Sequence, residues 1–168
     1  GAQFRCWGGD LMEAAGARLL VHYRHTAFMG FTVILKNLGT ISRNLRLCKK
    51  QIAEYKPDVI ILIDYPGFNL RIAKYAKLSG FRVFYYISPK FWAWNEGRVK
   101  KVKKYVDRMY IIFPFETEFY AVYNIPVKYQ GNPLVDEIEK RRSSLHSKDE
   151  ITRSLALGTK PVIAILAG

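Results

Sequence analysis

The feature that most constrains this fold is a run of five aliphatic residues, Val59–Ile63, that leads into an acidic residue and a Pro-Gly turn. An uninterrupted apolar run between turn signals is typical of a strand buried on both faces, as in a parallel sheet. In open parallel α/β sheets, ligands bind just beyond the carboxyl ends of the strands. Asp64 occupies that position, so it is the first candidate for chemistry.

Strand and helix patterns alternate along the rest of the chain. Strand patterns cover 4–7, 19–21, 59–63, 81–87, 109–112, 127–129 and 162–166, and helical patterns cover 10–17, 31–55, 68–79, 98–106, 116–123, 134–142 and 148–155. This alternation with short loops predicts an α/β fold with a doubly wound, mostly parallel, Rossmann-like sheet. Asp10 is expected to cap the first helix, and Gly80 to end the helix 68–79.

Right-handed crossovers place the carboxyl ends of parallel strands at one edge of the sheet. We therefore expect the segments 64–66, 88–89, 114–116 and 131–133 to share that edge. Each acidic or amide residue there has a second interpretation. Asp64 is either a general base or the acceptor of an Asx turn or helix cap before Gly67. Glu116 favours the helix dipole or orders the edge, and Asn132 fits a turn better than a ligand contact.

The net charge of +13 favours an anionic partner, which can be nucleic acid, a phosphorylated substrate or an anionic membrane. Seven basic residues lie between Lys90 and Arg108 against two acidic ones, on a helix face that is either simply solvated or attracts phosphates. Strands buried on both faces offer no exposed aromatics for single-stranded nucleic acid, so none is expected. Cys6 and Cys48 lack metal-ligand spacing, which argues against zinc and for a reducing cytoplasm.

Two apolar features leave alternatives open. The helix 31–55 carries an apolar face suited to packing on a sheet, but Phe31, Val33 and Leu47 lie off that face beside basic residues. Such surplus apolar surface is also typical of an interfacial membrane segment. Trp92 and Trp94 either plug a loop or form the floor of a sugar or acyl-chain site. No run is long enough for a membrane span, and we expect neither a span nor a signal peptide.

Four blocks together resemble a known family. They are Asp64-Tyr65-Pro66-Gly67-Phe68-Asn69, Tyr86-Ile87-Ser88-Pro89-Lys90 with Trp92-Ala93-Trp94, Phe113-Pro114-Phe115-Glu116 and Gly131-Asn132-Pro133, with Gly8-Gly9-Asp10 and Met29-Gly30 upstream. Their order and spacing resemble the lipid-A-disaccharide synthases. The Tyr65-Pro66-Gly67 and Phe84-Tyr85-Tyr86 forms are most similar to members from Bacteroidota-type bacteria.

The resemblance implies the N-terminal half of a glycosyltransferase with the GT-B architecture, in which two Rossmann-like domains enclose the active site. The implied reaction joins UDP-2,3-diacylglucosamine to lipid X (2,3-diacylglucosamine 1-phosphate), with inversion and without a metal or cofactor, to give UDP and a β-1′,6-linked lipid A disaccharide phosphate. Asp64 matches the proposed catalytic base. The implied substrate-binding residues are Pro66, Asn69, Ser88, Pro89, Trp92, Trp94, Arg98, Glu116 and Asn132.

The resemblance also implies a cytoplasmic protein at the inner face of the cytoplasmic membrane, and it allows a homodimer. The membrane-contact set is Phe31, Val33, Ile34, Leu35, Leu38 and Ile41. Val33 stands where many members carry an acidic residue. The implied domains are 1–145, an acceptor-side domain without the family's opening strand, 146–160, a connector, and 161–168, the first strand of a truncated nucleotide-binding domain. We expect no glycosyl transfer by residues 1–168 alone.

Three other functional classes remain open from the sequence. One is another GT-B enzyme for a UDP-sugar, either an epimerase or a transferase with a soluble acceptor. The second is a basic nucleic-acid-binding module, and the third is a membrane-docking domain without catalysis. Acyl-chain dependence of binding separates the first class from a lipid A enzyme, and salt dependence of oligonucleotide binding tests the second.

Overall fold

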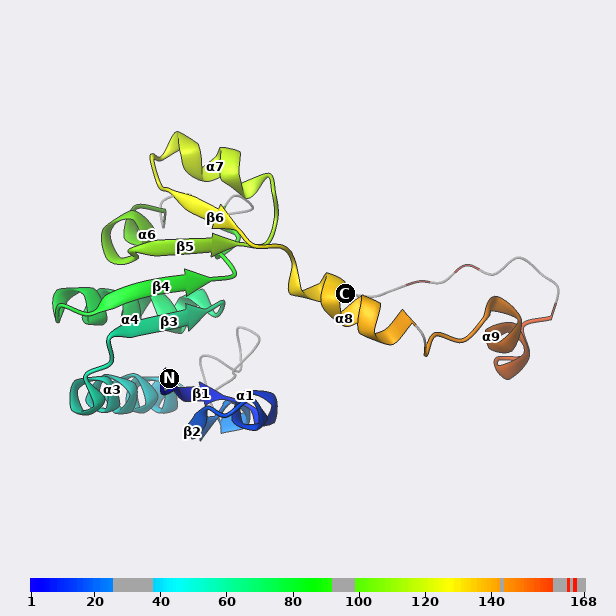
Figure 1. Ribbon diagram of the computed structural model, residues 1–168, viewed down its shortest axis with the longest axis horizontal. Helices are drawn as coiled ribbons and strands as arrows, with labels where there is room; N and C mark the ends of the chain where they lie inside the picture. The colour runs from blue at the N-terminus through cyan, green and yellow to red at the C-terminus, as the bar shows by residue number, and fades with distance from the viewer. Residues whose placement is uncertain (26–37, 92–98, 143, 159–162, 164, 166–168) are drawn as a thin grey trace. The chain divides into compact units, whose positions relative to one another are not determined.

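The computed structural model describes residues 1–25, 38–91, 99–142, 144–158, 163 and 165, which form two compact units, 1–129 and 130–168. The first unit contains β1 (Arg5–Gly8), α1 (Asp10–Ala14), β2 (Arg18–His22), the 3-10 helix η1 (Tyr23–His25), α3 (Leu38–Tyr55), β3 (Val59–Ile63), α4 (Pro66–Leu78), β4 (Arg82–Tyr86), α6 (Val99–Tyr105), β5 (Arg108–Ile111), α7 (Glu116–Val122) and β6 (Val127–Tyr129) (Figure 1). The second unit contains α8 (Pro133–Arg142) and α9 (Lys148–Ser154).

The main sheet has four parallel strands in the order β3-β4-β5-β6, and each neighbouring pair is joined through a helix (Figure 1). This confirms the predicted parallel α/β fold of Rossmann-like type. β1 and β2 form a separate parallel pair. Trp7 of β1 donates a hydrogen bond to Gln51 of α3 (2.6 Å), and its ring lies 5.8 Å from that of Phe68 in α4. The small sheet is therefore attached to the helices rather than to the edge of the main sheet.

The hydrophobic core lies on one face of the main sheet. Inward residues of three strands pack with residues of α4, α6 and α7; the core set includes Ile60, Leu62, Val83, Tyr85, Met109 and Ile111 from the strands and Ile72, Ala73, Ala76, Val99, Val102 and Tyr120 from the helices. α4 contacts α3 as well as α6. Leu45, Cys48 and Ile52 of α3 also pack against this core, as the helical pattern predicted.

One prediction about β3 is wrong. Ile60 and Leu62 are buried, but Ile61 and Ile63 keep 52% and 44% of their surface exposed. In the part of the chain that the structure describes, β3 is therefore buried on one face only. The helices that contribute to the core, α3, α4, α6 and α7, pack on the face of the sheet that carries Ile60 and Leu62. Apolar composition identified the strand correctly, but it did not show which elements cover it.

Two helix starts also differ from the sequence predictions. Gly9, not Asp10, is the N-cap of α1, and the Asp10 carboxylate lies 3.2 Å from His22 Nε2 instead. α4 begins at Pro66 rather than at Phe68, since proline fits the first position of a helix, where its missing N–H would have no partner. Gly80, with φ of +85°, follows α4 as predicted.

The carboxylate of Asp107 links the end of α6 to α4 and β4. It accepts hydrogen bonds from Lys77 Nζ and from the Val83 amide, the latter at 2.9 Å. Partial burial raises the pKa of Asp107, but the two hydrogen bonds and the charges of Lys77 and Arg82 outweigh it, so the pKa lies below the ordinary value of 3.8. The contact therefore depends on the ionised form.

A pH titration of stability tests this contact. A carboxylate with a lowered pKa in the folded chain stabilises the fold above its unfolded pKa, and the stabilisation is lost as the pH falls through the folded value. We expect the free energy of unfolding in urea to decrease as the pH falls below about 5, and Asp107→Asn to make this decrease smaller. Exposed Glu118→Gln is the control. An unchanged pH dependence in Asp107→Asn would contradict the assignment.

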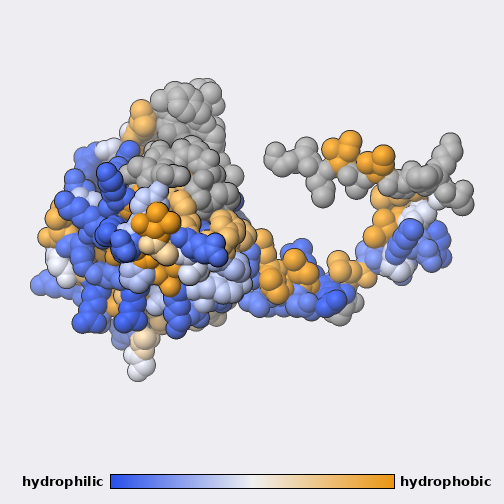
Figure 2. Space-filling model, turned by 90° about the horizontal axis from the view of Figure 1, so that it is seen from above, coloured by the Kyte–Doolittle hydropathy of each residue, from blue (hydrophilic) through white to orange (hydrophobic). Residues whose placement is uncertain are grey.

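The second unit exposes much of its apolar surface. Leu134, Val135 and Ile138 of α8 are each more than half exposed, and Figure 2 shows hydrophobic residues in orange on the surface of this unit. α9 begins with a capping box formed by Ser147 and Glu150. The predicted strand 162–166 falls largely outside the described residues. None of the helices in the described ranges combines the length and apolarity needed to cross a membrane.

Candidate active site

The parallel strands bring three of the four predicted segments to one edge of the sheet. Asp64 follows β3, Ser88 lies two residues after β4, and Glu116 begins the helix that follows β5. The strands point the same way in adjacent register, so these residues share the carboxyl edge, as predicted. The fourth segment, 131–133, belongs to the second unit.

Asp64 and Tyr65 form an unusual bend between β3 and α4. Both residues are left-handed, with φ of +45° and +46°, although neither is glycine. The predicted Pro-Gly turn is instead the first turn of α4, so the reversal of the chain is concentrated in these two residues. Ile87, which follows β4, is also left-handed, with φ of +62°. Non-glycine residues in this conformation cost about 1 to 2 kcal/mol each and require support from their surroundings.

The backbone of Asp64 is held from three sides. Its N–H donates to the carbonyl of Tyr86 in β4 (3.0 Å). Its carbonyl oxygen accepts from Asn69 Nδ2 (2.7 Å) and from the hydroxyl of Tyr85 (2.5 Å). Asn69 Nδ2 also donates to the Ile63 carbonyl at 3.0 Å, which uses the second hydrogen of the amide. The end of β3 is thus fixed by side chains from α4 and β4.

The carboxylate of Asp64, in contrast, is exposed and makes no hydrogen bond or ion pair with any residue that the structure describes. The N-cap of α4 is Tyr65, and no side chain caps that helix. Among the described residues, the Asp64 side chain therefore forms neither an Asx turn nor a helix cap. A carboxylate with both oxygens available at the sheet edge can accept a proton from a bound hydroxyl.

Ser88 and Glu116 form a second, fully buried network at this edge. Ser88 Oγ donates to Glu116 Oε1 (2.8 Å) and lies 2.8 Å from the hydroxyl of Tyr120. Glu116 Oε2 accepts from the amide of Phe113 at 3.1 Å, and Glu116 is only 1% exposed. Burial raises the pKa of Tyr120 to about 12, with the hydrogen bond between Tyr120 and Ser88 opposing the shift and the charge of Glu116 adding to it. Tyr120 therefore keeps its proton and can donate to Ser88.

This network joins the loop after β4 to the loop after β5. Such a position fits the interpretation of Glu116 as a residue that orders the edge, since both of its oxygens are used inside the protein. Its direct contact with a substrate stays a prediction. Pro89 is buried beside Ser88, and its carbonyl accepts from the amide of Phe91, which is itself buried. The segment after β4 is therefore anchored by three buried residues, Ser88, Pro89 and Phe91.

Several predicted site residues fall outside the described part of the chain. Trp92, Trp94 and Arg98 are among them, as are Phe31, Val33, Ile34 and Leu35 of the membrane-contact set. The remaining two members of that set lie in α3, where Leu38 is 54% exposed and Ile41 is half-buried. Asn132 Oδ1 accepts from the Leu134 amide at 3.0 Å, which is the turn interpretation favoured by the sequence. Pro66 is partly buried as the first residue of α4.

Two tyrosines of the site were not predicted from the sequence. Tyr85 and Tyr120 are completely buried, and each places its hydroxyl in one of the two networks. Burial is the main reason that the pKa of Tyr85 is raised, and the charge of Asp64 raises it further. The available signal was the alternation in β4, which puts Tyr85 on the core face with a polar atom that needs a partner.

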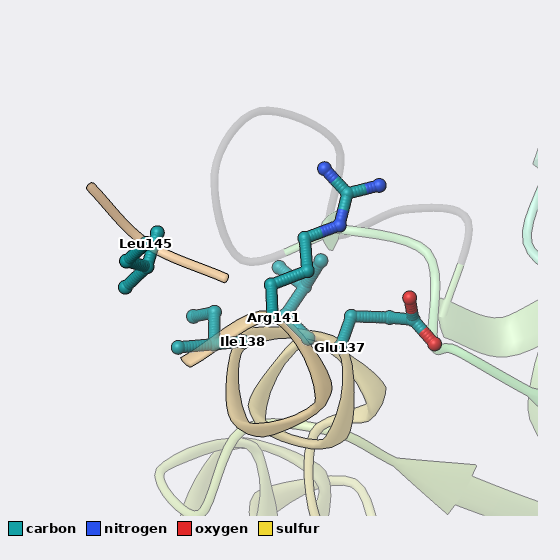
Figure 3. A pocket seen from close by; sticks show the side chains of 5 residues that line it. Glu137, Ile138, Arg141 and Leu145 are labelled. Atoms are coloured by element: carbon teal, nitrogen blue, oxygen red, sulfur yellow. The ribbon is translucent and has the colours of Figure 1, made fainter. Parts of the chain in front are cut away.

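A shallow hollow of about 420 Å³ lies in the second unit. It is lined by Leu134, Glu137, Ile138, Arg141 and Leu145, and Figure 3 shows the charged groups of Glu137 and Arg141 extending away from Leu145. It carries none of the residues predicted for chemistry. In the described ranges, no group of three or more His, Cys, Asp or Glu side chains could hold a metal ion.

The parallel sheet defines the class of the protein, which is a Rossmann-like α/β domain, and the polar residues at the carboxyl edge of its strands form the candidate site. A family model described as lipid-A-disaccharide synthetase matches residues 1–168. The chain therefore belongs to the lipid-A-disaccharide synthetase family.

Curated relatives agree with the family match. Proteins named lipid-A-disaccharide synthase from Trichlorobacter lovleyi and Coxiella burnetii are 41% and 40% identical over 162 residues, which is 96% of this chain and 41% and 42% of the relatives. One from Geobacter metallireducens is 44% identical over 136 residues, 81% of this chain and 35% of the relative. The chain thus spans about two fifths of the length of these relatives.

Proposed function

We propose that residues 1–168 form the acceptor-side part of a glycosyltransferase that makes lipid A disaccharide. The donor is UDP-2,3-diacylglucosamine, the acceptor is 2,3-diacylglucosamine 1-phosphate, and the products are the β-1′,6-linked disaccharide phosphate and UDP. The observation that carries this proposal is the match to the family over the whole chain, with an exposed carboxylate at the sheet edge where the family resemblance calls for a base. Residues 1–145 supply the acceptor side, 146–160 the connector, and 161–168 the start of the nucleotide-binding side.

The mechanism assigns Asp64 the role of general base. Its carboxylate accepts the proton of the acceptor hydroxyl while that oxygen attacks the anomeric carbon of the donor. The bond from the anomeric carbon to the UDP oxygen breaks, and UDP leaves with the bonding electrons. Attack on the face opposite the leaving group inverts the anomeric centre, and no metal or cofactor takes part.

A membrane surface is part of the same proposal, because both substrates carry acyl chains. The outward face of α6 carries Lys100, Lys101, Lys103 and Lys104, all exposed. Exposed Arg71 and Lys74 lie on the neighbouring α4, which contacts α6 and has no acidic residue. Basic side chains near an anionic bilayer contribute about 1 kcal/mol each. We place the protein at the cytoplasmic face of the inner membrane.

The proposed reaction is tested with the gene product extended to the length of the curated relatives. Incubated with both acylated substrates, it is expected to form the disaccharide phosphate and UDP in equal amounts, whereas residues 1–168 alone form neither. An acceptor without acyl chains serves as the control for a soluble-acceptor enzyme. Equal turnover of that acceptor, or disaccharide formation by residues 1–168 alone, would contradict the proposal.

A further inference from the structure

The geometry points to Tyr85 and Asn69 as positioning residues that hold Asp64 ready for proton transfer; this inference rests on the proposed function. Both side chains donate to the same atom, the carbonyl oxygen of Asp64, at 2.5 Å and 2.7 Å. They come from different elements, β4 and α4. A carbonyl oxygen that accepts two donors has both lone pairs used, so the peptide that follows Asp64 cannot rotate without breaking them.

The bend explains why such a clamp is needed. Asp64 and Tyr65 are consecutive left-handed residues, and without support their backbone would relax to a right-handed or extended form. Strain of this kind persists only when the surroundings over-determine it, and it gathers at functional sites. Relaxation of Asp64 would turn its carboxylate away from the edge. The strained residues, Asp64 and Tyr65, therefore lie at the end of β3, where the Asp64 carboxylate must project toward a substrate.

The side chain of Asp64 adds a second reason. The carboxylate makes no hydrogen bond or ion pair with a described residue, so among these residues it is the backbone that fixes its direction. A base oriented through its backbone has no described side chain bonded to its oxygens. Tyr85 is completely buried and lies in the core, which makes it a rigid donor. Asn69 has both amide hydrogens engaged, on Ile63 and on Asp64, and is equally fixed.

Tyr85→Phe is the sharpest variant, because it removes one hydroxyl and keeps the buried ring. In the full-length gene product we expect kcat to fall about 5- to 30-fold, which is the rate loss that corresponds to one hydrogen bond. KM for both substrates should change less than about twofold. Tyr75→Phe is the matched control, since it also removes a hydroxyl that donates to a backbone carbonyl, that of Lys49, but between α3 and α4. It should leave kcat unchanged.

A double-mutant cycle separates positioning from general structural damage. If Tyr85 acts through the carboxylate of Asp64, Tyr85→Phe should lower kcat in the wild-type background but not in the Asp64→Asn background. An equal loss in both backgrounds, or no loss in the wild type, overturns the inference. If Asp64→Asn alone keeps full activity, the assigned role of Asp64 in the proposed function fails instead, which is a different result.

Hydrogen exchange gives a readout that needs no activity. In residues 1–168, the Asp64 amide donates to Tyr86 and the Asn69 amide to Tyr65, both at 3.0 Å, so both report on the bend. Tyr85→Phe is expected to speed exchange at these two amides at least about fivefold, while Tyr75→Phe leaves them unchanged. Unchanged exchange at both amides in Tyr85→Phe would also overturn the clamp.

Discussion

Replacing Asp64 with Asn in the full-length gene product is expected to lower kcat for disaccharide formation by about 10²- to 10⁴-fold, the usual contribution of a general base. Asparagine has nearly the same shape as aspartate but cannot accept the proton of the acceptor hydroxyl. It also tolerates the left-handed conformation that residue 64 adopts, so the bend should survive. The assay follows UDP release and disaccharide formation with both substrates saturating.

Asn is a cleaner substitution here than Ala. Alanine at φ of +45° is strained, so Asp64→Ala removes the carboxylate and also destabilises the bend. The exposed carboxylate makes no hydrogen bond or ion pair with a described residue, and Asp64→Asn should therefore leave the melting temperature of residues 1–168 within about 2 °C of the wild type. Exposed Asp58→Asn, before β3, is the control for charge. Full activity of Asp64→Asn with an intact fold would show that Asp64 is structural.

The sequence predicted β1 to β6 and most of the described helices because their apolar patterns are local. Val59–Ile63 was predicted with the bounds that β3 has, and Val99 and Val102 of α6 point inward as expected. The burial of β3 was overestimated, since a continuous apolar run does not specify how many layers cover it. Exposure of Ile61 and Ile63 depends on which helices pack there, and that is a tertiary property.

The site was only partly predictable, for two physical reasons. The Asp64–Tyr65 bend uses left-handed residues that are not glycine, so no glycine in the sequence indicated its position. The Pro-Gly signal indicated a turn at the next two residues instead, and these begin α4. The hydrogen bonds of Tyr85 and Glu116 reach residues 21 and 28 positions away. Periodicity shows which face such a residue occupies, but not the partner that folding brings to it.

Glu116→Ala is expected to destabilise residues 1–168 by about 3 to 5 kcal/mol, measured by urea unfolding. The substitution removes the carboxylate that accepts from the Ser88 hydroxyl and from the Phe113 amide, and it leaves Ser88, only 5% exposed, with the more distant Pro89 carbonyl at 3.3 Å as an acceptor. A buried donor without a partner costs about 1 to 3 kcal/mol, and the space left by the side chain adds to this. Because Ser88 keeps its hydrogen bond with Tyr120, we expect the loss of stability to stay below about 5 kcal/mol.

Comparison with Glu118 and with glutamine separates the two interpretations of Glu116. Glu118 lies in the same first turn of α7 but is exposed, so Glu118→Ala should cost less than about 1 kcal/mol through the helix dipole alone. Glu116→Gln keeps the shape but offers one oxygen to two donors, and the backbone amide of Phe113 cannot turn away. An intermediate loss is therefore expected. If Glu116→Ala were as mild as Glu118→Ala, the dipole interpretation would be sufficient, and the buried link between the loops after β4 and β5 would contribute nothing measurable.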